Sequence, residues 1–336
     1  MRLQGLRRAA MPWMLLLAAV SQLSLVSAAD SYDSLVAAIR AANSGGSGEI
    51  TLSGDIVLTA ALPTITGSVT IDGGGRSISW DDAHRIFDVN GGALTLSNVT
   101  LTGGNTPDDE DGGAIRARAG AEVSVQQVTF RNNTAYQGGA IAASGAGVQL
   151  DVRQSSFIGN SSGAYAAAIF GYGSVVDITS SSFQRNSAQG DGGAIAAHEE
   201  ARMSISNSSF AGNAANVGGA LEVFASTVSL THVTMMNNTA TPVGGGAIHR
   251  TAGEISLYNS IVGGAPGGNA CANGLTEARG NLSQDGTCSL METRVDPLVG
   301  ELTGAPAWYP LLDGSPALDA ADTEFCLPVD QVGTSR

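Results

Sequence analysis

The middle of this sequence repeats itself with a period of about 26 residues, and no other feature limits the possible folds as much. One motif, an aromatic or methionine residue followed three positions later by Asn, recurs at spacings of 27, 26, 27 and 25 residues. A second motif, Gly-Gly-Ala-Ile or a close variant, recurs at spacings of 26, 28, 26, 26 and 27 residues. Two independent motifs that keep one period indicate stacked structural repeats. The first motif begins at Phe130, Phe157, Phe183, Phe210 and Met235, and the second ends at Ile115, Ile141, Ile169, Ile195, Leu221 and Ile248.

Within each repeat, apolar residues alternate with polar ones over short runs, as in Val123-Ser-Val125 and Val128-Thr-Phe130. Such alternation is typical of half-buried strands and not of helices. Three short strands and three turns per period make one coil of a solenoid, in which each strand pairs with its copy one period later. We therefore predict an all-β fold, a single-domain right-handed parallel β-helix with three sheets and roughly eight to nine coils.

The same periodicity assigns roles to the two motifs. The Asn residues are expected at turns, where they can adopt positive φ and form an amide ladder from coil to coil. The paired glycines are expected to permit a tight bend or a left-handed residue where a Cβ atom would clash. Both roles are structural, so we do not expect the Asn row to be a ligand site.

Both ends of the repeat region carry different sequence. Residues 1–29 have a basic start, an apolar run from Met11 to Val26 and small residues before Asp30, which is the pattern of a secretory signal peptide. Residues 34–43 predict a short capping helix with Ser34 as its N-cap. We assign residues 30–264 to the β-helix with its cap, and residues 265–336 to a loop-rich, anchor-like C-terminal segment. No later run is long and apolar enough to span a bilayer, so we expect an exported protein that is secreted or held at the cell surface.

The charge excludes some partners. The chain has 30 acidic and 16 basic residues, all of them Arg, and a formal net charge of −14. It therefore lacks the basic surface that nucleic acid or anionic lipid requires. The oligomeric state is open.

These motifs resemble the repeats of the chlamydial polymorphic outer-membrane proteins, and the chain as a whole resembles bacterial secreted right-handed β-helix proteins. Residues 33–43 are similar to the "CSLREAI…AAN" cap of a bacterial surface-protein family, with Asp33 in place of its cysteine. Residues 296–331, which include Leu311-Leu-Asp-Gly-Ser-Pro-Ala-Leu-Asp319 and end in Asp330-Gln331, resemble the "choice-of-anchor Q" segment. Val332 stands where that segment usually has Arg. The resemblance implies a β-helix at the cell surface but assigns no activity.

All three cysteines lie in the last quarter of the chain. Cys271 and Cys288 enclose a short loop in a protein that we expect to be exported, so we predict a disulfide between them. Cys326 is then left unpaired. The C-terminal segment has no histidine, which argues against a metal site there.

No sequence pattern identifies a catalytic site, a cofactor or a metal. The acidic run Pro107–Asp111 could in principle hold Ca²⁺, as carboxylates do in parallel β-helix pectate lyases, but we expect a solvated acidic turn. A lyase would also need a basic residue, and Arg116 and Arg118 are the nearest to the run. Hydrolysis would need paired carboxylates, and none recurs on neighbouring coils. The four histidines, His84, His198, His232 and His249, have no Ser or Cys partner pattern.

Aromatic residues provide the remaining functional hint. Tyr136, Tyr165, Phe170 and Tyr172 fall near corresponding turns of adjacent coils and could form stacking platforms for sugars, or could simply pack. We therefore predict a binding or adhesion module without catalysis, whose partner is a polysaccharide or a cell-envelope glycan. The alternatives are a lyase or hydrolase acting on acidic polysaccharide, with Asp109 and Arg116 as the residues to test, and a purely structural envelope protein.

Overall fold

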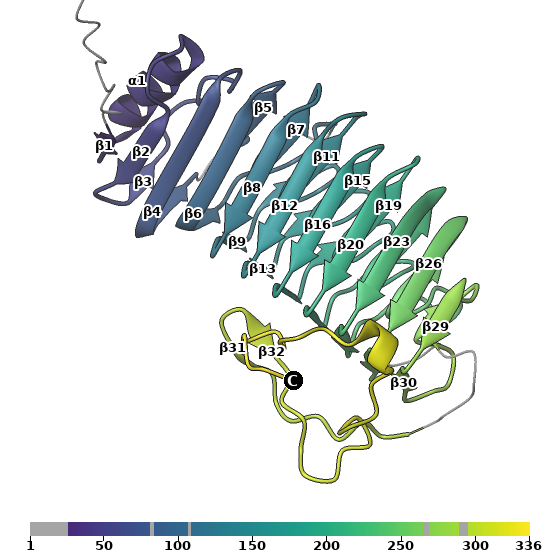
Figure 1. Ribbon diagram of the computed structural model, residues 1–336. Coiled ribbons are helices and arrows are strands. Elements are labelled where there is room, and N and C mark those ends of the chain that lie inside the picture. The colour runs from purple at the N-terminus through teal and green to yellow at the C-terminus, as the bar shows by residue number, and fades with distance from the viewer. Residues whose placement is uncertain (1–25, 81–83, 107–108, 265–268, 289–294) are drawn as a thin grey trace, which may run out of the picture.

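The computed structural model describes residues 26–80, 84–106, 109–264, 269–288 and 295–336. It is a parallel β-helix of about nine stacked coils with one α-helix at its N-terminal end and a non-repetitive tail that folds back beside the coils (Figure 1). The predicted fold class is thereby confirmed. The predicted signal peptide lies largely outside the described residues, and the last residues assigned to it form β1 (Ser27–Ala29), which pairs in parallel with β2.

From the coil of β4 onward, each coil contributes one strand to each of three faces. The first and second faces join into one 19-stranded sheet, because β4 and β6 continue from one face to the other. The third face is an eight-stranded sheet. The first face contains β1, β2 (Glu49–Leu52), the start of β4 (Ser68–Ser79), the start of β6 (Ala93–Thr102), β8 (Glu122–Gln126), β12 (Gln149–Arg153), β16 (Val175–Thr179), β20 (Arg202–Ser206), β23 (Ser226–Thr231), β26 (Gly253–Tyr258) and β29 (Glu277–Arg279). The second contains β3 (Ile56–Val57), the ends of β4 and β6, β9 (Thr129–Arg131), β13 (Ser156–Ile158), β17 (Ser182–Gln184), β21 (Ser209–Ala211), β24 (Thr234–Met236), β27 (Ile261–Gly263) and β30 (Leu282–Ser283). The third contains β5 (Phe87–Asn90), β7 (Ile115–Arg118), β11 (Ile141–Ser144), β15 (Ile169–Tyr172), β19 (Ile195–His198), β22 (Leu221–Phe224), β25 (Ile248–Arg250) and β28 (Cys271–Ala272).

The interior is a stack of identical side chains. Phe157 pairs in register with Phe130 on one side and with Phe183 on the other. The four Phe rings of the repeat lie 4.6 to 4.8 Å apart, nearly parallel, and are fully buried. The spacing follows from the strand separation, because each ring sits directly over its copy one coil earlier. The sequence period therefore predicted the core.

The Asn residues of the first motif form the predicted ladder. The side-chain amide of Asn160 donates to Oδ1 of Asn186 at 2.9 Å and to the backbone carbonyl of Phe130 at 3.2 Å. The ladder consists of Asn133, Asn160, Asn186, Asn213 and Asn238, all of them buried. One detail differs from the prediction: positive φ falls on the residue before each ladder Asn, such as Asn132 or Arg185. The ladder Asn can therefore point inward while its neighbour turns the chain.

The turns from the second face to the third contain short strands and the Gly-Gly-Ala-Ile segments. β10 (Thr134–Ala135), β14 (Ser161–Ser162) and β18 (Ser187–Ala188) form a three-stranded row just after the ladder. The first Gly of each Gly-Gly-Ala-Ile segment has the predicted left-handed backbone, and a Cβ atom at Gly138 would lie 2.3 Å from the Ile141 carbonyl oxygen. In the Ala-Ala-Ala-Ile repeat, Ala166 takes this conformation with a φ of 52°.

The N-terminal cap is helix α1 (Tyr32–Asn43). The prediction of Ser34 as its N-cap is wrong: Ser31 is the cap, and Ser34 completes a capping box at the third helical position. The buried face of the helix includes Leu35 and Ile39, which cover the first coil. This closes the apolar interior at that end.

Parallel pairing continues past Gly264 through β28, β29 and β30. The predicted disulfide between Cys271 and Cys288 is present and joins β28 to the segment after β30. Cys326 is free and exposed. The remaining tail contains the hairpin β31 (Thr303–Gly304) and β32 (Ala307–Trp308) and the 3₁₀ helix η1 (Thr323–Phe325), and it runs beside the second face (Figure 1).

Candidate functional site

The outer surface of the third face holds the residues with the most chemistry. Side chains alternate along each strand, so the first and third residues of each strand point into the core and the second and fourth point outward. The outward pairs change along the stack from charged to small to aromatic. They are Asp88 and Asn90, Arg116 and Arg118, Ala142 and Ser144, Phe170 and Tyr172, Ala196 and His198, and Glu222 and Phe224.

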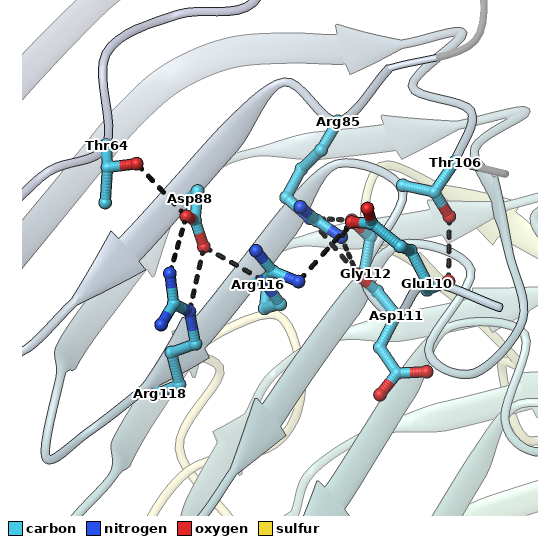
Figure 2. Close-up of polar contacts among 9 residues, drawn as sticks. All are labelled: Thr64, Arg85, Asp88, Thr106, Glu110, Asp111, Gly112, Arg116 and Arg118. Atoms are coloured by element: carbon cyan, nitrogen blue, oxygen red, sulfur yellow. Dashed lines mark hydrogen bonds and ion pairs between the residues drawn. The ribbon is translucent and has the colours of Figure 1, made fainter.

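At the N-terminal end of this face, Asp88 on β5 binds two arginines of β7 (Figure 2). Its carboxylate accepts hydrogen bonds from Arg116 Nε at 3.0 Å and from Arg118 Nη2 at 3.0 Å. Arg118 Nε donates a further, longer bond at 3.4 Å, and Thr64 donates another at 3.2 Å. Burial alone would raise the pKa of Asp88, but the two arginines outweigh it and lower the pKa to about 2.

A second carboxylate beside these arginines belongs to Glu110, in the acidic run Pro107–Asp111. Glu110 accepts hydrogen bonds from Arg85 Nη2 at 2.8 Å and from Arg116 Nη1 at 3.4 Å, and the bond from Arg85 lowers the pKa of Glu110. Arg85 also donates to the backbone carbonyls of Asp111 and Gly112. We call Arg85, Asp88, Glu110, Arg116 and Arg118 the charged cluster (Figure 2).

The charged cluster is internally paired. Arg116 bridges Asp88 and Glu110, so its guanidinium is already held by two carboxylates. Burial raises the pKa of the Asp111 carboxyl, which points away from the arginines (Figure 2). Pro107 and Asp108 lie outside the described residues, and Asp109 is exposed. Within the described parts of the chain, no group of three or more His, Cys, Asp or Glu side chains could hold a metal ion.

The centre of the third face carries the aromatic cluster, which we define as Tyr165, Phe170, Tyr172, His198 and Phe224. Phe170 lies 6.2 Å from Tyr165 and 6.3 Å from Tyr172, ring centre to ring centre. His198 lies 4.7 Å from Tyr165 and 5.7 Å from Phe224. Phe170 is buried outside the main core, against Ala166 and Ala196. Tyr172 and Phe224, in contrast, are 45 % and 36 % exposed.

Register explains how these rings meet. Tyr172 on β15, His198 on β19 and Phe224 on β22 occupy the same position in three consecutive strands. Their side chains therefore leave the sheet side by side, one strand spacing apart. The result is a row in which a half-buried imidazole lies between two exposed aromatic rings.

A polar network adjoins this row. Nε2 of His198 lies 2.7 Å from Oε2 of Glu222, whose side chain is almost fully buried. Thr251 donates to the other carboxylate oxygen of Glu222 at 3.1 Å and contacts Nδ1 of His249 at 3.3 Å. Burial, and next to it the charge of Glu222, raises the pKa of Asp191 in the turn before β19. The cluster therefore combines apolar rings with hydrogen-bonding groups that are fixed in position.

The structure brings together part of what the sequence singled out. Tyr165, Phe170 and Tyr172 meet as the aromatic hypothesis required, whereas no ring contact links Tyr136 to them within the described residues. His198 and His249 join one polar network, while His232 contacts the C-terminal tail and His84 packs on Trp80. Glu222 and Phe224 were missed. Their signal was present, because alternation along Leu221-Glu-Val-Phe places both outward.

Comparison with known proteins gives one similarity. Two segments, residues 127–144 and 180–198, match the Chlamydia polymorphic membrane protein repeat. Each segment covers one passage from the second face to the third, through β9 to β11 and β17 to β19, and contains one ladder Asn and one Gly-Gly-Ala-Ile motif. No curated protein and no solved structure matches the chain.

Proposed function

We propose that this protein is a surface-exposed β-helix that binds a neutral glycan on the aromatic cluster. The observation that carries the proposal is that Tyr172 and Phe224 are exposed on either side of the half-buried His198 in one row. Aromatic rings cover the apolar faces of pyranose rings, and nearby polar groups take the sugar hydroxyls. Here His198 supplies such a group, and the buried Glu222, itself held by Thr251, fixes the imidazole in place.

Charge favours a neutral sugar over an acidic one. The chain has a formal net charge of −14, which repels polyanions. The arginines of the charged cluster are bound to Asp88 and Glu110, so they offer little to a uronate. A ligand made of neutral pyranoses is not repelled by the net charge and does not need a free arginine.

Exposure at the cell surface is supported by the sequence and by the repeat. The first 29 residues have the signal-peptide pattern, and the matched repeat is that of a membrane protein of Chlamydia. None of the described helices is long and apolar enough to cross a membrane. Residues 296–331 resemble a surface anchor segment, and we propose that they contribute to attachment. Fractionating cells that express the full chain, with and without residues 296–336, tests this role.

The binding proposal is tested with a glycan array followed by calorimetric titration of the full chain. Tyr172→Ala and Phe224→Ala should each weaken binding at least tenfold, and the double variant should abolish it. Tyr136→Ala is the matched control, since Tyr136 is similarly exposed at 40 % but lies outside the cluster. Equal binding by the double variant and the parent would refute the assigned site. Absence of any glycan ligand would favour a structural envelope role.

Hydrolysis of the bound glycan is a second candidate, favoured by one observation. Asp191 and Glu222 lie on adjacent coils beside the aromatic cluster, and the pKa of Asp191 is raised as a general acid requires. Release of reducing ends that Asp191→Asn and Glu222→Gln both abolish, while binding persists, would establish this activity. A lyase is less favoured, because Arg116 is engaged by two carboxylates.

A further inference from the structure

The corner between the first and second faces carries a row of left-handed residues that, over seven successive coils, contains no glycine. Seven non-glycine residues, one per coil, have φ between 47° and 56° there. We call them the corner row: Asn98, Gln127, Gln154, Ser180, Asn207, His232 and Asn259. Because a left-handed residue turns the chain sharply, each side chain projects away from the coil.

The C-terminal half of the corner row binds the chain's own tail, mainly through the tail's backbone. Asn259 donates to the carbonyl of Asp322 at 3.0 Å and accepts from its N–H at 2.7 Å. His232 accepts from the N–H of Leu327 at 3.3 Å. Asn207 donates to the carbonyl of Val329 at 3.1 Å. These corner side chains thus hold an extended peptide that advances by about two residues per coil from Leu327 onward.

The tail leaves the corner row at Gln331, which bonds to Ser209 and to the carbonyl of Ala307. Beyond that point Gln154, Gln127 and Asn98 continue the same row, and all three are exposed. Asn207, by comparison, is only 4 % exposed beneath the tail. The same type of corner side chain is therefore covered in one half of the row and uncovered in the other.

Two cavities lie along the half of the corner row that the tail does not cover. A cavity of about 380 Å³ lies between Gln127 and Gln154 on the coil side and Trp308 and Pro306 of the tail hairpin on the other. A second cavity of about 350 Å³ continues past Asn98 to Gly74 and Gly75, and it shares Asn98, Gln127 and Thr129 with the first. Together they form a groove along the stack, which we call the corner groove. No charged residue lines it.

We propose that the corner groove binds an extended, uncharged peptide of a partner protein, in line with the chain's own tail. Gln127 and Gln154 would bond the peptide backbone as Asn207 and Asn259 bond the tail, since a primary amide both donates and accepts. Trp308 and Pro306 provide an apolar wall for one side chain of the peptide. Three strand spacings of the groove correspond to about four extended residues. This site lies on a different face from the aromatic cluster, so it is independent of glycan binding.

The test is selection of phage-displayed random dodecapeptides on the full chain, with synthetic copies of the enriched peptides measured by fluorescence anisotropy. Binding should shift the emission of Trp308, and Gln127→Ala/Gln154→Ala should weaken it at least tenfold. Gln149→Ala is the matched control, because Gln149 is exposed on the same coil but lies on the first face and should have no effect.

Three results would overturn the proposal. The first is that no enriched peptide depends on Gln127 and Gln154. The second is a peptide that binds more tightly to Asn259→Ala, because it would then replace the tail rather than occupy the corner groove. The third is a neutral oligosaccharide that shifts Trp308 emission with the same dependence on Gln127 and Gln154, which would assign the groove to a sugar.

Discussion

Asn160 donates its side-chain amide to Oδ1 of Asn186, which lies directly beneath it on the next coil, at 2.9 Å. The backbone N–H of Asn160 uses the same oxygen at 3.1 Å. Asn186 in turn donates to Asn213 and to the carbonyl of Phe157. A polar side chain can occupy the dry interior here because each of its groups has a partner.

Replacing Asn186 by Leu should be among the most harmful single changes in the chain. It removes the oxygen that accepts from both the backbone N–H and the side-chain amide of Asn160, and it removes the side-chain donor to the carbonyl of Phe157. Each buried unpaired group costs about 1–3 kcal/mol, so a loss of at least about 3 kcal/mol in unfolding free energy is expected. Chemical denaturation measures it. Asn216→Leu is the control: Asn216 donates to Gln189 near the surface, and its loss should cost under about 1 kcal/mol.

Removing one ring from the aromatic stack should be equally costly. Phe183 lies between Phe157 and Phe210, at 4.8 and 4.6 Å, and is fully buried. Phe183→Ala should lower the unfolding free energy by about 3–5 kcal/mol through lost burial and an unfilled cavity. Phe224→Ala on the outer surface should cost roughly 1 kcal/mol. Equal thermal melting of the two variants would mean that Phe183 is not a core residue.

The charged cluster should add stability that disappears in acid. The pKa of Asp88 is about 2 in the folded chain and near 3.8 when unfolded, so its contribution is complete above pH 4 and is lost as the pH falls toward 2. This difference in the pKa of Asp88 corresponds to about 2–3 kcal/mol. Asp88→Asn should therefore be less stable than the parent by at least this amount at pH 7, and the gap should close between pH 4 and pH 2. Asp177→Asn, at an exposed position on β16, should show no such convergence.

The tail should loosen as the pH falls. Burial, aided by the charge of Arg336, lowers the pKa of His232 to about 4, although its contact with the Phe325 backbone opposes this. His232 is therefore neutral when the tail is docked. The equilibrium shifts toward the undocked tail as the pH drops from 6.5 through 4, because the undocked state binds the proton more tightly. Hydrogen exchange of residues 320–331 should be faster at pH 5 than at pH 7 once corrected for the intrinsic rate.

His232→Asn tests the cause of that loosening. Asn occupies the equivalent corner positions 207 and 259, where it binds the tail, so the variant should keep the tail docked without the pH dependence. His84→Asn is the control, because His84 packs on Trp80 away from the tail. A parent tail with the same corrected protection at pH 5 and pH 7 would contradict the assignment.

The fold was predictable because it repeats. Phe130 to Phe210 and the Gly-Gly-Ala-Ile segments recur at the distance of one coil, so position in the sequence translated directly into position in the core. The disulfide was predictable for a simpler reason, since Cys271 and Cys288 enclose a short loop. Features that occur only once in the chain were harder to predict. The N-cap of α1 is Ser31 and not Ser34, and the sequence did not distinguish the two because both are serines within one turn of each other.

The candidate site was predictable only in part. Tyr165, Phe170 and Tyr172 are close in sequence, whereas Glu222 and Phe224 reach the cluster from two coils away. The docking of the tail had no sequence signal, because it depends on corner residues 25 to 29 positions apart meeting a segment without periodicity. Only the folded chain shows that Asn259 and Asp322 are partners.

Strict register from coil to coil has a consequence for how such a chain can change length. Each strand of the central coils pairs with its copy at matching positions, so the top of one coil is chemically equivalent to the top of the next. A whole period is therefore an exchangeable unit: excising one would rejoin Phe to Phe and Asn to Asn, and would shorten the rod without creating a mismatched seam. Losing a single residue would instead reverse which side chains face the interior from that point to the next turn.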